Sequence, residues 1–354
     1  MSPLDFSKDC LVVYASCGEG HKKAGLALAD YFKISCLDLL DFSCPYIKIL
    51  YSRGYRFVTK NLPLLWLVLF EVTKLKIIRV MFSQVHLFFF LAFIEFIRKN
   101  RPKIIITTHF FPIPLILKVK HQLNLKLVTI VTDFGIHPLW IDKNVDFYLV
   151  AFEITKKGLI AKGIEEKNIE VTGFPLRRGF RETLDKDYLR RKFSLDSRPG
   201  ILLFSSTQGD IPFLEDIVKG LKRDFNLFII YGDNKKIRAF LNKVKDHSVR
   251  YFSYYEKIWE LMDISLAVIT KPGGLTVFET LYKRKPLIFT HFIWGQEKIN
   301  LDIVLKLGLG FLTPSFEELK KLIYSLRDNK VLYKNHNWED KDIFFTVENT
   351  IRGL

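Results

Sequence analysis

The chain has 354 residues, a length that as a prior corresponds to two domains of about 150 residues each. Hydrophobic residues make up 49% of the chain and charged residues 26%, which excludes a disordered or fibrous protein. Lys and Arg number 54 against 38 Asp and Glu, a formal net charge of +16. So basic a chain is expected to meet an acidic partner: nucleic acid, anionic lipid or a phosphorylated substrate.

The cysteines and the apolar runs indicate whether the chain carries disulfides, a zinc site or a membrane-spanning helix. The four cysteines lie within the first 44 residues and form no CxxC pair, so we expect reduced thiols and no zinc site. The first residues are polar and carry no signal-peptide pattern. The apolar runs at 62–70 and 87–94 are shorter than the roughly 20 residues of a membrane span. We therefore expect no transmembrane helix.

Strand-like and helix-like segments alternate along both halves of the chain. In the first half the expected strands span residues 10–16, 103–107, 126–131, 146–150 and 169–171, and the helical patterns between them span 21–33, 113–122 and 152–162. In the second half the expected strands span residues 200–204, 226–231, 249–252, 266–269 and 286–290, and a last helix covers 341–352. Such alternation predicts parallel sheets covered by helices on both faces.

The domain organisation follows from this alternation. A stretch with Gly and Pro at residues 172–178 suits a linker. We therefore predict an α/β protein with two Rossmann-like domains, residues 1–175 and 176–354, whose final helix can pack back on the first domain. Ligands of such sheets bind at the carboxyl ends of the strands, so we expect a site in an interdomain cleft.

Residues 45–103 interrupt the regular alternation and are mostly helical in pattern. They carry eleven Lys and Arg against two Glu, together with twelve aromatic residues. Basic residues interleaved with aromatic ones favour docking on anionic lipid, where each Lys or Arg near the surface contributes about 1 kcal/mol. Two other interpretations are a core helix pair with a solvated basic face and a single-stranded nucleic-acid surface.

The first motif that carries chemistry is SCGEGH at residues 16–21, between the first strand and a helix. Glycines there allow close backbone approach, and the helix N-terminus favours anions. No GKS or GKT follows, so the motif is not a P-loop. His21 at the helix start can take a proton from an acceptor hydroxyl. The alternative is a histidine that only caps the helix.

Two further motifs follow strands of the second half. KPGGLTVFE at residues 271–279 opens a helix, so Gly273, Gly274 and the next N–H groups can hold a diphosphate, and Glu279 can accept hydrogen bonds from ribose hydroxyls. The alternative is a turn followed by a surface Glu. GQEKIN at residues 295–300 places amide and carboxylate groups that suit the vicinal hydroxyls of a sugar, although a polar first turn is common.

The fourth motif is VTDF at residues 131–134, followed by His137 and Trp140. It also ends a strand, so Asp133 could orient His21 or bind the acceptor. The alternative is an Asp that caps a loop.

In this order the motifs SxGxGH, VTDFxxHPxW, TGFPLR, KPGGLTxxE and GQExxN resemble the monogalactosyldiacylglycerol synthases and the bacterial processive diacylglycerol glucosyltransferases. These enzymes are relatives of the N-acetylglucosaminyltransferase that forms lipid II. The resemblance runs from about residue 10 to residue 330. It implies a GT-B fold, inverting chemistry, a UDP-sugar donor held by the C-terminal domain, and a peripheral position at the cytoplasmic face of the membrane.

The resemblance also implies roles for single residues. His21 becomes the base, with Asp133 as the second catalytic candidate. The donor site is expected to comprise Ser206, Thr207, Lys271, Gly273, Gly274, Leu275, Thr276, Glu279, Gln296, Glu297 and Asn300. The acceptor and membrane site is expected to comprise Gly18, Gly20, Lys48, Arg53, Tyr55, Arg56, Lys60, Pro63 and Trp66. The sequence departs from the family at SSTQGD, residues 205–210, where a glycine-rich loop is usual, and at Arg178, where a second proline is usual.

Together these observations predict an inverting glycosyltransferase that moves a hexose from a UDP-sugar to diacylglycerol or a similar lipid alcohol. The resemblance implies a reaction without a required metal, so we expect neither a metal nor a cofactor besides the UDP-sugar co-substrate, and no nucleic-acid partner. The alternatives are a nucleotide-sugar epimerase or cell-wall-precursor transferase of the same fold, and a basic lipid- or nucleic-acid-binding protein without activity.

Overall fold

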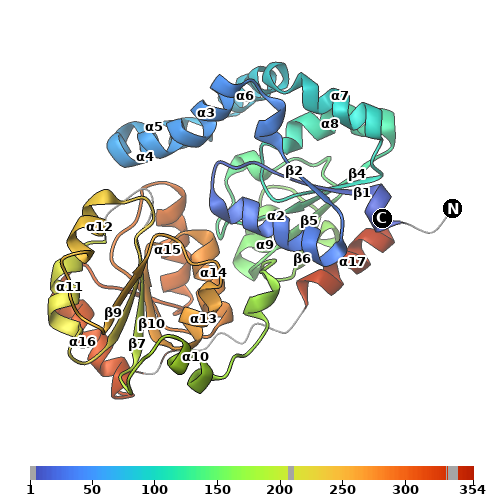
Figure 1. Ribbon diagram of the computed structural model, residues 1–354. Coiled ribbons are helices and arrows are strands. Elements are labelled where there is room, and N and C mark those ends of the chain that lie inside the picture. The colour runs from blue at the N-terminus through green and yellow to red at the C-terminus, as the bar shows by residue number, and fades with distance from the viewer. Residues whose placement is uncertain (1–4, 206–210, 332, 334–341) are drawn as a thin grey trace. The chain divides into compact units, whose positions relative to one another are not determined.

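The computed structural model describes residues 5–205, 211–331, 333 and 342–354 (Figure 1). It divides into two compact units. Unit 1 comprises residues 1–177 together with 338–354, and unit 2 comprises residues 178–337. The C-terminal helix α17 (Ile343–Gly353) thus belongs to the first unit, although it follows the second unit in the sequence.

Unit 1 is built on a sheet of six parallel strands in the order β2-β1-β3-β4-β5-β6. Their bounds are β1 Cys10–Tyr14, β2 Ser35–Asp38, β3 Ile104–Thr107, β4 Lys126–Ile130, β5 Phe147–Val150 and β6 Ile169–Val171. The predicted parallel sheet is confirmed. Strand β2 lies on one side of β1 and β3 on the other, so the strand order reverses between β1 and β3. Open α/β sheets bind their ligands at such a reversal, outside the carboxyl ends of the strands.

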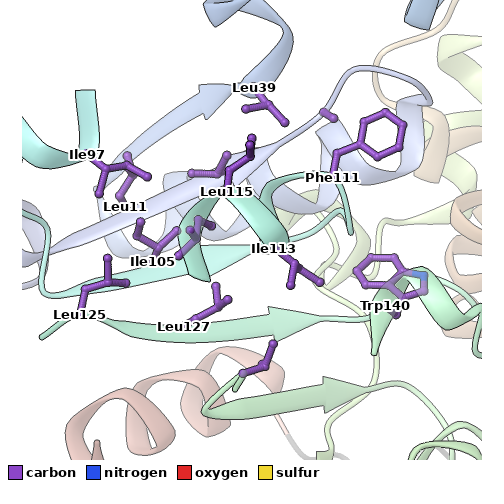
Figure 2. Packing of buried hydrophobic residues seen from close by; sticks show 14 of the residues in the cluster. Leu11, Leu39, Ile97, Ile105, Phe111, Ile113, Leu115, Leu125, Leu127 and Trp140 are labelled. Atoms are coloured by element: carbon purple, nitrogen blue, oxygen red, sulfur yellow. The ribbon is translucent and has the colours of Figure 1, made fainter. Parts of the chain in front are cut away.

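Both faces of this sheet are buried, because all five residues of β1 are buried and successive side chains of a strand point to opposite faces. Leu11 and Val13 point to a cluster covered by helices α7 and α8, and Figure 2 shows Leu11, Ile97 and Leu115 packed there. Val12 points to the opposite cluster, which α2 and α17 cover. The helices of the unit outside the segment 45–100 are α1 Phe6–Asp9, α2 Glu19–Phe32, α8 Pro112–Leu123, α9 Glu153–Ile160 and α17, with short 3-10 turns at Leu39–Phe42, Pro138–Trp140 and Glu166–Asn168.

The segment between β2 and β3 is helical, as its sequence pattern predicts. It comprises α3 Pro45–Ile49, a π-helical turn at Leu50–Gly54, α4 Tyr55–Asn61, α5 Pro63–Val72, α6 Lys76–Phe89 and α7 Leu91–Asn100. Across the described ranges, no helix taken alone has both the length and the apolar character to cross a membrane; α6 and α7 meet that test only as a pair, bent by 68°.

Unit 2 contains the second sheet of six parallel strands, in the order β12-β11-β10-β7-β8-β9. Its strands are β7 Gly200–Phe204, β8 Asn226–Ile230, β9 Val249–Phe252, β10 Ser265–Thr270, β11 Leu287–Phe289 and β12 Phe311–Leu312. Its helices are α10 Lys186–Lys192, α11 Leu214–Leu221, α12 Lys235–Leu241, α13 Ile258–Asp263, α14 Gly274–Tyr282, α15 Gln296–Lys306 and α16 Phe316–Arg327, with a 3-10 turn at Arg178–Phe180. The strand order reverses between β7 and β10, so the carboxyl ends of these two strands flank the expected ligand position.

Candidate functional site

His21 stands where the first strand of unit 1 gives way to a helix. Gly18 is the N-cap of α2, and His21 is the third residue of that helix. The Nδ1 atom of its ring lies 2.9 Å from the carbonyl oxygen of Thr108, just after β3. Because a carbonyl oxygen only accepts, Nδ1 carries the proton and donates it there. The Nε2 atom of a neutral ring is then left with a lone pair, as a general base requires.

Two threonine side chains hold the histidine in this position. The hydroxyl oxygen of Thr132, which follows β4, lies 2.7 Å from Nδ1 of His21. The hydroxyl of Thr108 donates to the backbone carbonyl of His21 at 2.8 Å. Residues after three adjacent strands therefore converge on one imidazole, at the reversal of strand order that the fold offers for a ligand.

The electrostatic surroundings keep this imidazole neutral. Burial lowers the pKa of His21, and the nearby Asp133 carboxylate opposes that shift. The His109 ring lies edge-on with its centroid 4.3 Å from that of His21, and burial holds the pKa of His109 well below its ordinary value. Both rings are therefore uncharged near neutral pH, the protonation state in which His21 can accept a proton.

Asp133 lies close to His21, but its hydrogen bond runs to a different side chain. The indole Nε1–H of Trp140 donates to Oδ2 of Asp133 at 2.9 Å, and Trp140 is fully buried. Burial raises the pKa of Asp133, while His21 and the indole hydrogen bond act in the opposite direction. The contacts that orient the His21 ring thus come from Thr108 and Thr132, and Asp133 acts on it through its charge.

The donor motif of unit 2 follows β10 at the second reversal of strand order. Gly273 is the N-cap of α14, and no side chain caps the helix there. The first N–H groups of an α-helix have no partner within the helix, and the helix dipole favours negative charge at that end. Gly274, Leu275 and Thr276 form this first turn and are partly buried, so their N–H groups suit a phosphate group.

Hydrogen bonds join the two predicted sugar-nucleotide motifs into one site. The ammonium of Lys271 pairs with the Glu297 carboxylate, which also accepts from the N–H of Ile293 at 3.0 Å. The Asn300 amide donates to the carbonyl of Pro272 at 3.1 Å, and the Gln296 amide donates to Asn300 at 3.2 Å. The beginnings of α14 and α15 therefore lie side by side.

The remaining predicted donor residues are Glu279, which the structure describes, and Ser206 and Thr207, which it does not. Glu279 lies in the middle of α14 with 2% of its surface exposed, so its carboxylate is deeply set rather than a surface group. Ser206 and Thr207 lie outside the described residues.

Gly295, the N-cap of α15, has a φ of 96°, a backbone conformation that favours glycine, so the turn before Gln296 depends on this residue.

The helices of residues 45–100 expose an unusual number of apolar side chains. Of the 27 exposed large hydrophobic side chains among the described residues, 16 lie here. We call these 16 the apolar helical surface: Tyr46, Ile49, Leu50, Phe57, Leu62, Leu64, Leu65, Val68, Leu69, Leu75, Ile77, Val80, Met81, Val85, Phe88 and Leu91. Exposed apolar patches of this kind mark protein or membrane interaction sites.

The predicted membrane residues belong to the same helices. Lys48, Arg53 and Lys60 are exposed, and Lys48 pairs with Asp41. Pro63 is exposed at the first position of α5. The side chain of Arg56 lies outside the description. Among the residues described, exposed cations therefore accompany the exposed apolar groups.

Ring contacts connect α5 to the loop that carries Asp133. Tyr55 lies edge-on to Trp66 at 5.1 Å between ring centroids, and Trp66 neighbours Phe70 at 6.2 Å. Phe70 in turn contacts His137 at 4.9 Å, and the hydroxyl oxygen of Thr73 lies 3.3 Å from Nε2 of His137. The apolar helical surface and the His21 site thus share one packed framework within unit 1.

Sequence reasoning did not assign roles to Thr108, His109 and Thr132. Thr108 and His109 follow β3, which flanks the reversal of strand order, and Thr132 follows the neighbouring strand β4; this position at the carboxyl ends of the strands is the signal that could have found them. Thr108 is separated from His21 by 87 positions and becomes its neighbour through the parallel pairing of β1 with β3.

Two units, each built on a sheet of six parallel strands, have the architecture of the GT-B glycosyltransferases. Residues 21–176 match the family model described as monogalactosyldiacylglycerol (MGDG) synthase, and residues 211–293 match the glycosyltransferase family 28 C-terminal domain. A relative named processive diacylglycerol beta-glucosyltransferase, from Bacillus licheniformis, is 26% identical over 343 residues, covering 91% of this chain and 88% of the relative. The family resemblance read from the motifs is therefore confirmed.

Solved structures support the same fold at low sequence identity. A putative UDP-N-acetylglucosamine 2-epimerase from Listeria monocytogenes superposes with a TM-score of 0.63 at 16% identity, covering 98% of this chain and 96% of the other. The MurG structure from Acinetobacter baumannii gives a TM-score of 0.62 at 12% identity, covering 98% and 99%. At these identities the likeness concerns the fold alone.

Proposed function

We propose that the protein transfers a hexose from a UDP-sugar to diacylglycerol or a similar lipid alcohol, with inversion at the anomeric carbon. The observation that carries the proposal is the His21 imidazole, whose Nδ1–H is committed to the Thr108 carbonyl so that Nε2 is the basic atom. Relatives named as diacylglycerol glucosyltransferases support the choice of acceptor and of reaction.

In the proposed reaction the acceptor hydroxyl oxygen attacks the anomeric carbon in one in-line displacement. Its proton passes to Nε2 of His21, and the bond between the anomeric carbon and the UDP oxygen breaks with its electron pair leaving on UDP. The neutral state that burial favours for His21 is the one able to take this proton.

The proposed donor site is the start of α14 with its neighbours. The N–H groups of Gly274, Leu275 and Thr276 stabilise the negative charge that grows on the leaving diphosphate. Gln296 and Asn300, joined by a hydrogen bond, are proposed to face the hexose, and Glu279 the ribose. Lys271 is held by Glu297 close to the same turn.

The proposed acceptor route begins at a membrane. The apolar helical surface buries side chains in the interfacial region of a bilayer, and the adjacent Lys and Arg residues meet anionic headgroups. The protein would then act as a peripheral enzyme at the cytoplasmic face, without a nucleic-acid partner. The ring contacts from Trp66 through Phe70 to His137 support a link between this surface and the His21 site.

We also propose that the reaction needs no metal or cofactor, since in the described ranges no group of three or more His, Cys, Asp or Glu could hold a metal ion. The decisive experiment incubates the protein with UDP-glucose or UDP-galactose and diacylglycerol vesicles, with and without EDTA. Glycolipid and released UDP in both arms support the proposal. Free epimerised nucleotide sugar without glycolipid, or no UDP release, would refute it, and loss with EDTA that Mg²⁺ or Mn²⁺ restores would refute the metal-free mechanism.

A further inference from the structure

Unit 2 contains a cavity at the edge of its sheet opposite the donor motif. The cavity has a volume of about 460 Å³. Pro199, Ile264 and Pro286, which precede β7, β10 and β11, contribute to its lining, so it lies at the amino ends of these strands. The donor motif follows the carboxyl end of β10, so the two places are separated by the length of the sheet.

Positive charge dominates the lining of this cavity. Lys186 and Arg190 come from one face of α10, at positions i and i+4, and Arg284 and Lys285 come from the turn between α14 and β11. Like charges at this helical spacing destabilise a helix unless an anion compensates them. Four cationic residues from two separate segments thus line one cavity.

The acidic group in the described lining does not balance this charge. Asp263 lines the cavity, but its carboxylate forms an ion pair with Lys283 at 3.0 Å, and both side chains are almost completely buried. The charge of Asp263 is therefore already matched by a fifth cation.

Lys285 is held so that it can still donate a hydrogen bond. Its ammonium donates to the backbone carbonyls of Asp263 and Ser265, both at 2.9 Å. An ammonium has three N–H donors, so two are used by these carbonyls. Burial lowers the pKa of Lys285 to about 8; the charges of Lys186 and Lys283 act in the same direction, and the charge of Asp263 opposes them. An anion at this position would relieve that repulsion.

We propose that this cavity binds a soluble multivalent phosphate anion of the pyrophosphate class. Its volume lies within the range of about 300–1,000 Å³ typical of small-molecule sites. A bilayer is the less favoured occupant, because most of the exposed apolar side chains of the described residues lie on the apolar helical surface of unit 1. The proposal does not depend on the proposed transferase activity, since the donor motif lies at the other end of the sheet.

The test is a calorimetric titration of the full chain with inorganic pyrophosphate. The variant Arg190→Ser/Arg284→Asn removes two lining cations, and asparagine tolerates the left-handed backbone at position 284, where φ is 53°. Its matched control is Lys235→Ser/Arg238→Ser on α12, which removes the same charge from the same unit outside the lining. Melting temperatures of all three proteins report folding, and Lys186→Ser serves if the double variant does not fold.

We expect the wild type and the control to bind pyrophosphate equally, and the cavity variant to lose one site per chain or to bind it about tenfold or more weakly. Equal binding by all three proteins would overturn the proposal, because pyrophosphate would then occupy another site. A parallel arm measures binding to anionic phospholipid vesicles. If the cavity variant loses vesicle binding while none of the proteins binds pyrophosphate, the occupant is a lipid headgroup and the soluble-anion proposal is refuted.

Discussion

Nδ1 of His21 lies 2.9 Å from the carbonyl oxygen of Thr108, which can only accept, so the proton is assigned to Nδ1, the Thr132 hydroxyl oxygen at 2.7 Å is a second acceptor, and Nε2 is the basic nitrogen. A backbone carbonyl cannot donate, so the proton cannot shift to the other nitrogen without breaking the bond. The basic Nε2 is therefore set by the main chain rather than by a mutable side chain. A ring fixed in this way is prepared for proton transfer before a substrate arrives.

The first prediction concerns the base itself. We expect His21→Ala to lower kcat by about 10²–10⁴, the usual contribution of general acid–base catalysis. Affinity for UDP should remain, because the donor motif belongs to the other unit. In the wild type the rate should fall as pH drops through the pKa of His21, and burial places that fall below about pH 6.5.

The His21 side chain does not cap α2, so the alternative to a catalytic role is a structural one through its bond to Thr108, which has a different signature. Loss of that hydrogen bond costs about 1 kcal/mol of stability and leaves near-normal turnover in the folded fraction. Turnover, UDP affinity and melting temperature measured on one preparation separate the two roles. Near-wild-type turnover would remove His21 as the base and make Asp133 the next residue to substitute.

The second prediction concerns Thr132, whose hydroxyl oxygen lies 2.7 Å from Nδ1 of His21. Thr132→Val removes this contact and leaves the Thr108 carbonyl in place, so we expect kcat to fall about 3- to 10-fold, as for one neutral hydrogen bond. The acid limb of the pH–rate profile should also shift, because the surroundings of the titrating ring change.

Thr129, on strand β4 just before Thr132, provides the matched control. Its buried hydroxyl has no hydrogen-bond partner among the described residues, so Thr129→Val removes an unsatisfied group and should leave both kcat and the pH profile unchanged. Thr132→Ser, which keeps the hydroxyl, should restore activity. A purely structural role of Thr132 would instead lower stability without moving the pH profile.

The local sequence pattern predicted much of this architecture, but it did not predict which residues would surround His21. The buried strand before SCGEGH and the two glycines within that motif were sufficient to place His21 near the carboxyl end of β1. The residues that orient its ring come from β3 and β4, and their proximity depends on parallel pairing across long sequence separations, which no local periodicity contains.

Two of the short edge strands, β2 and β12, were not predicted, whereas the edge strands β6 and β9 were. Strand β2 has only four residues, pairs only with β1 in the sheet and is largely exposed or partly exposed, so it shows neither alternation nor a continuous apolar run. Strand β12 lies at an edge of the sheet of unit 2 and has only two residues. In contrast, strand β8 is fully buried and β10 almost fully; both carry the apolar runs typical of central parallel strands and were predicted.

The third prediction concerns donor binding. If Glu279 accepts hydrogen bonds from both ribose hydroxyls, Glu279→Gln should weaken UDP binding by roughly 1.5–3 kcal/mol, the contribution of charge-assisted hydrogen bonds. Calorimetry with UDP measures this loss. Glu317→Gln, an exposed change on α16, is the control and should bind UDP as the wild type does. Unchanged UDP affinity of Glu279→Gln would contradict the assignment.

The fourth prediction concerns the membrane. Replacing Lys48, Arg53, Arg56 and Lys60 by Ser should weaken binding to anionic vesicles by up to about 1 kcal/mol per charge, and the wild-type binding itself should weaken as salt rises. Affinity for UDP should be unchanged. Cosedimentation with anionic and neutral vesicles provides the measurement.

The control for charge alone removes four cations from unit 2, those of Lys235, Lys236, Arg238 and Lys243. This control should bind anionic vesicles nearly as the wild type does. The apolar contribution is tested separately by Leu64→Ser/Phe88→Ser, two side chains that are 77% and 72% exposed. Binding that is equal for anionic and neutral vesicles in the wild type and the charge variant would reject the electrostatic part of the proposal.

The fifth prediction concerns His86, a fully buried histidine of α6 near the His21 site. Its ring contacts Phe82, Phe90 and Phe111 at centroid distances of 5.0, 4.5 and 5.0 Å, and its Nε2 atom has no hydrogen-bond partner. Burial in this aromatic surrounding lowers the pKa of His86 to about 4.

Because the folded pKa of His86 is about 4 and the unfolded value about 6.5, the unfolded chain binds the proton first as pH falls. The free energy of unfolding should therefore decrease as pH falls from about 6.5 towards 4, with a contribution from this residue of up to about 3 kcal/mol. His86→Phe removes the titrating group and keeps an aromatic ring, so urea unfolding of this variant should lose less stability between about pH 7 and 4.5 than the wild type does. His121→Phe, at an exposed histidine, should keep the wild-type pH dependence. If His86→Phe and the wild type lose stability equally over this range, His86 is not the group that makes the fold acid-sensitive. The other histidines whose pKa values burial lowers, His21, His109 and His137, then become the residues to substitute.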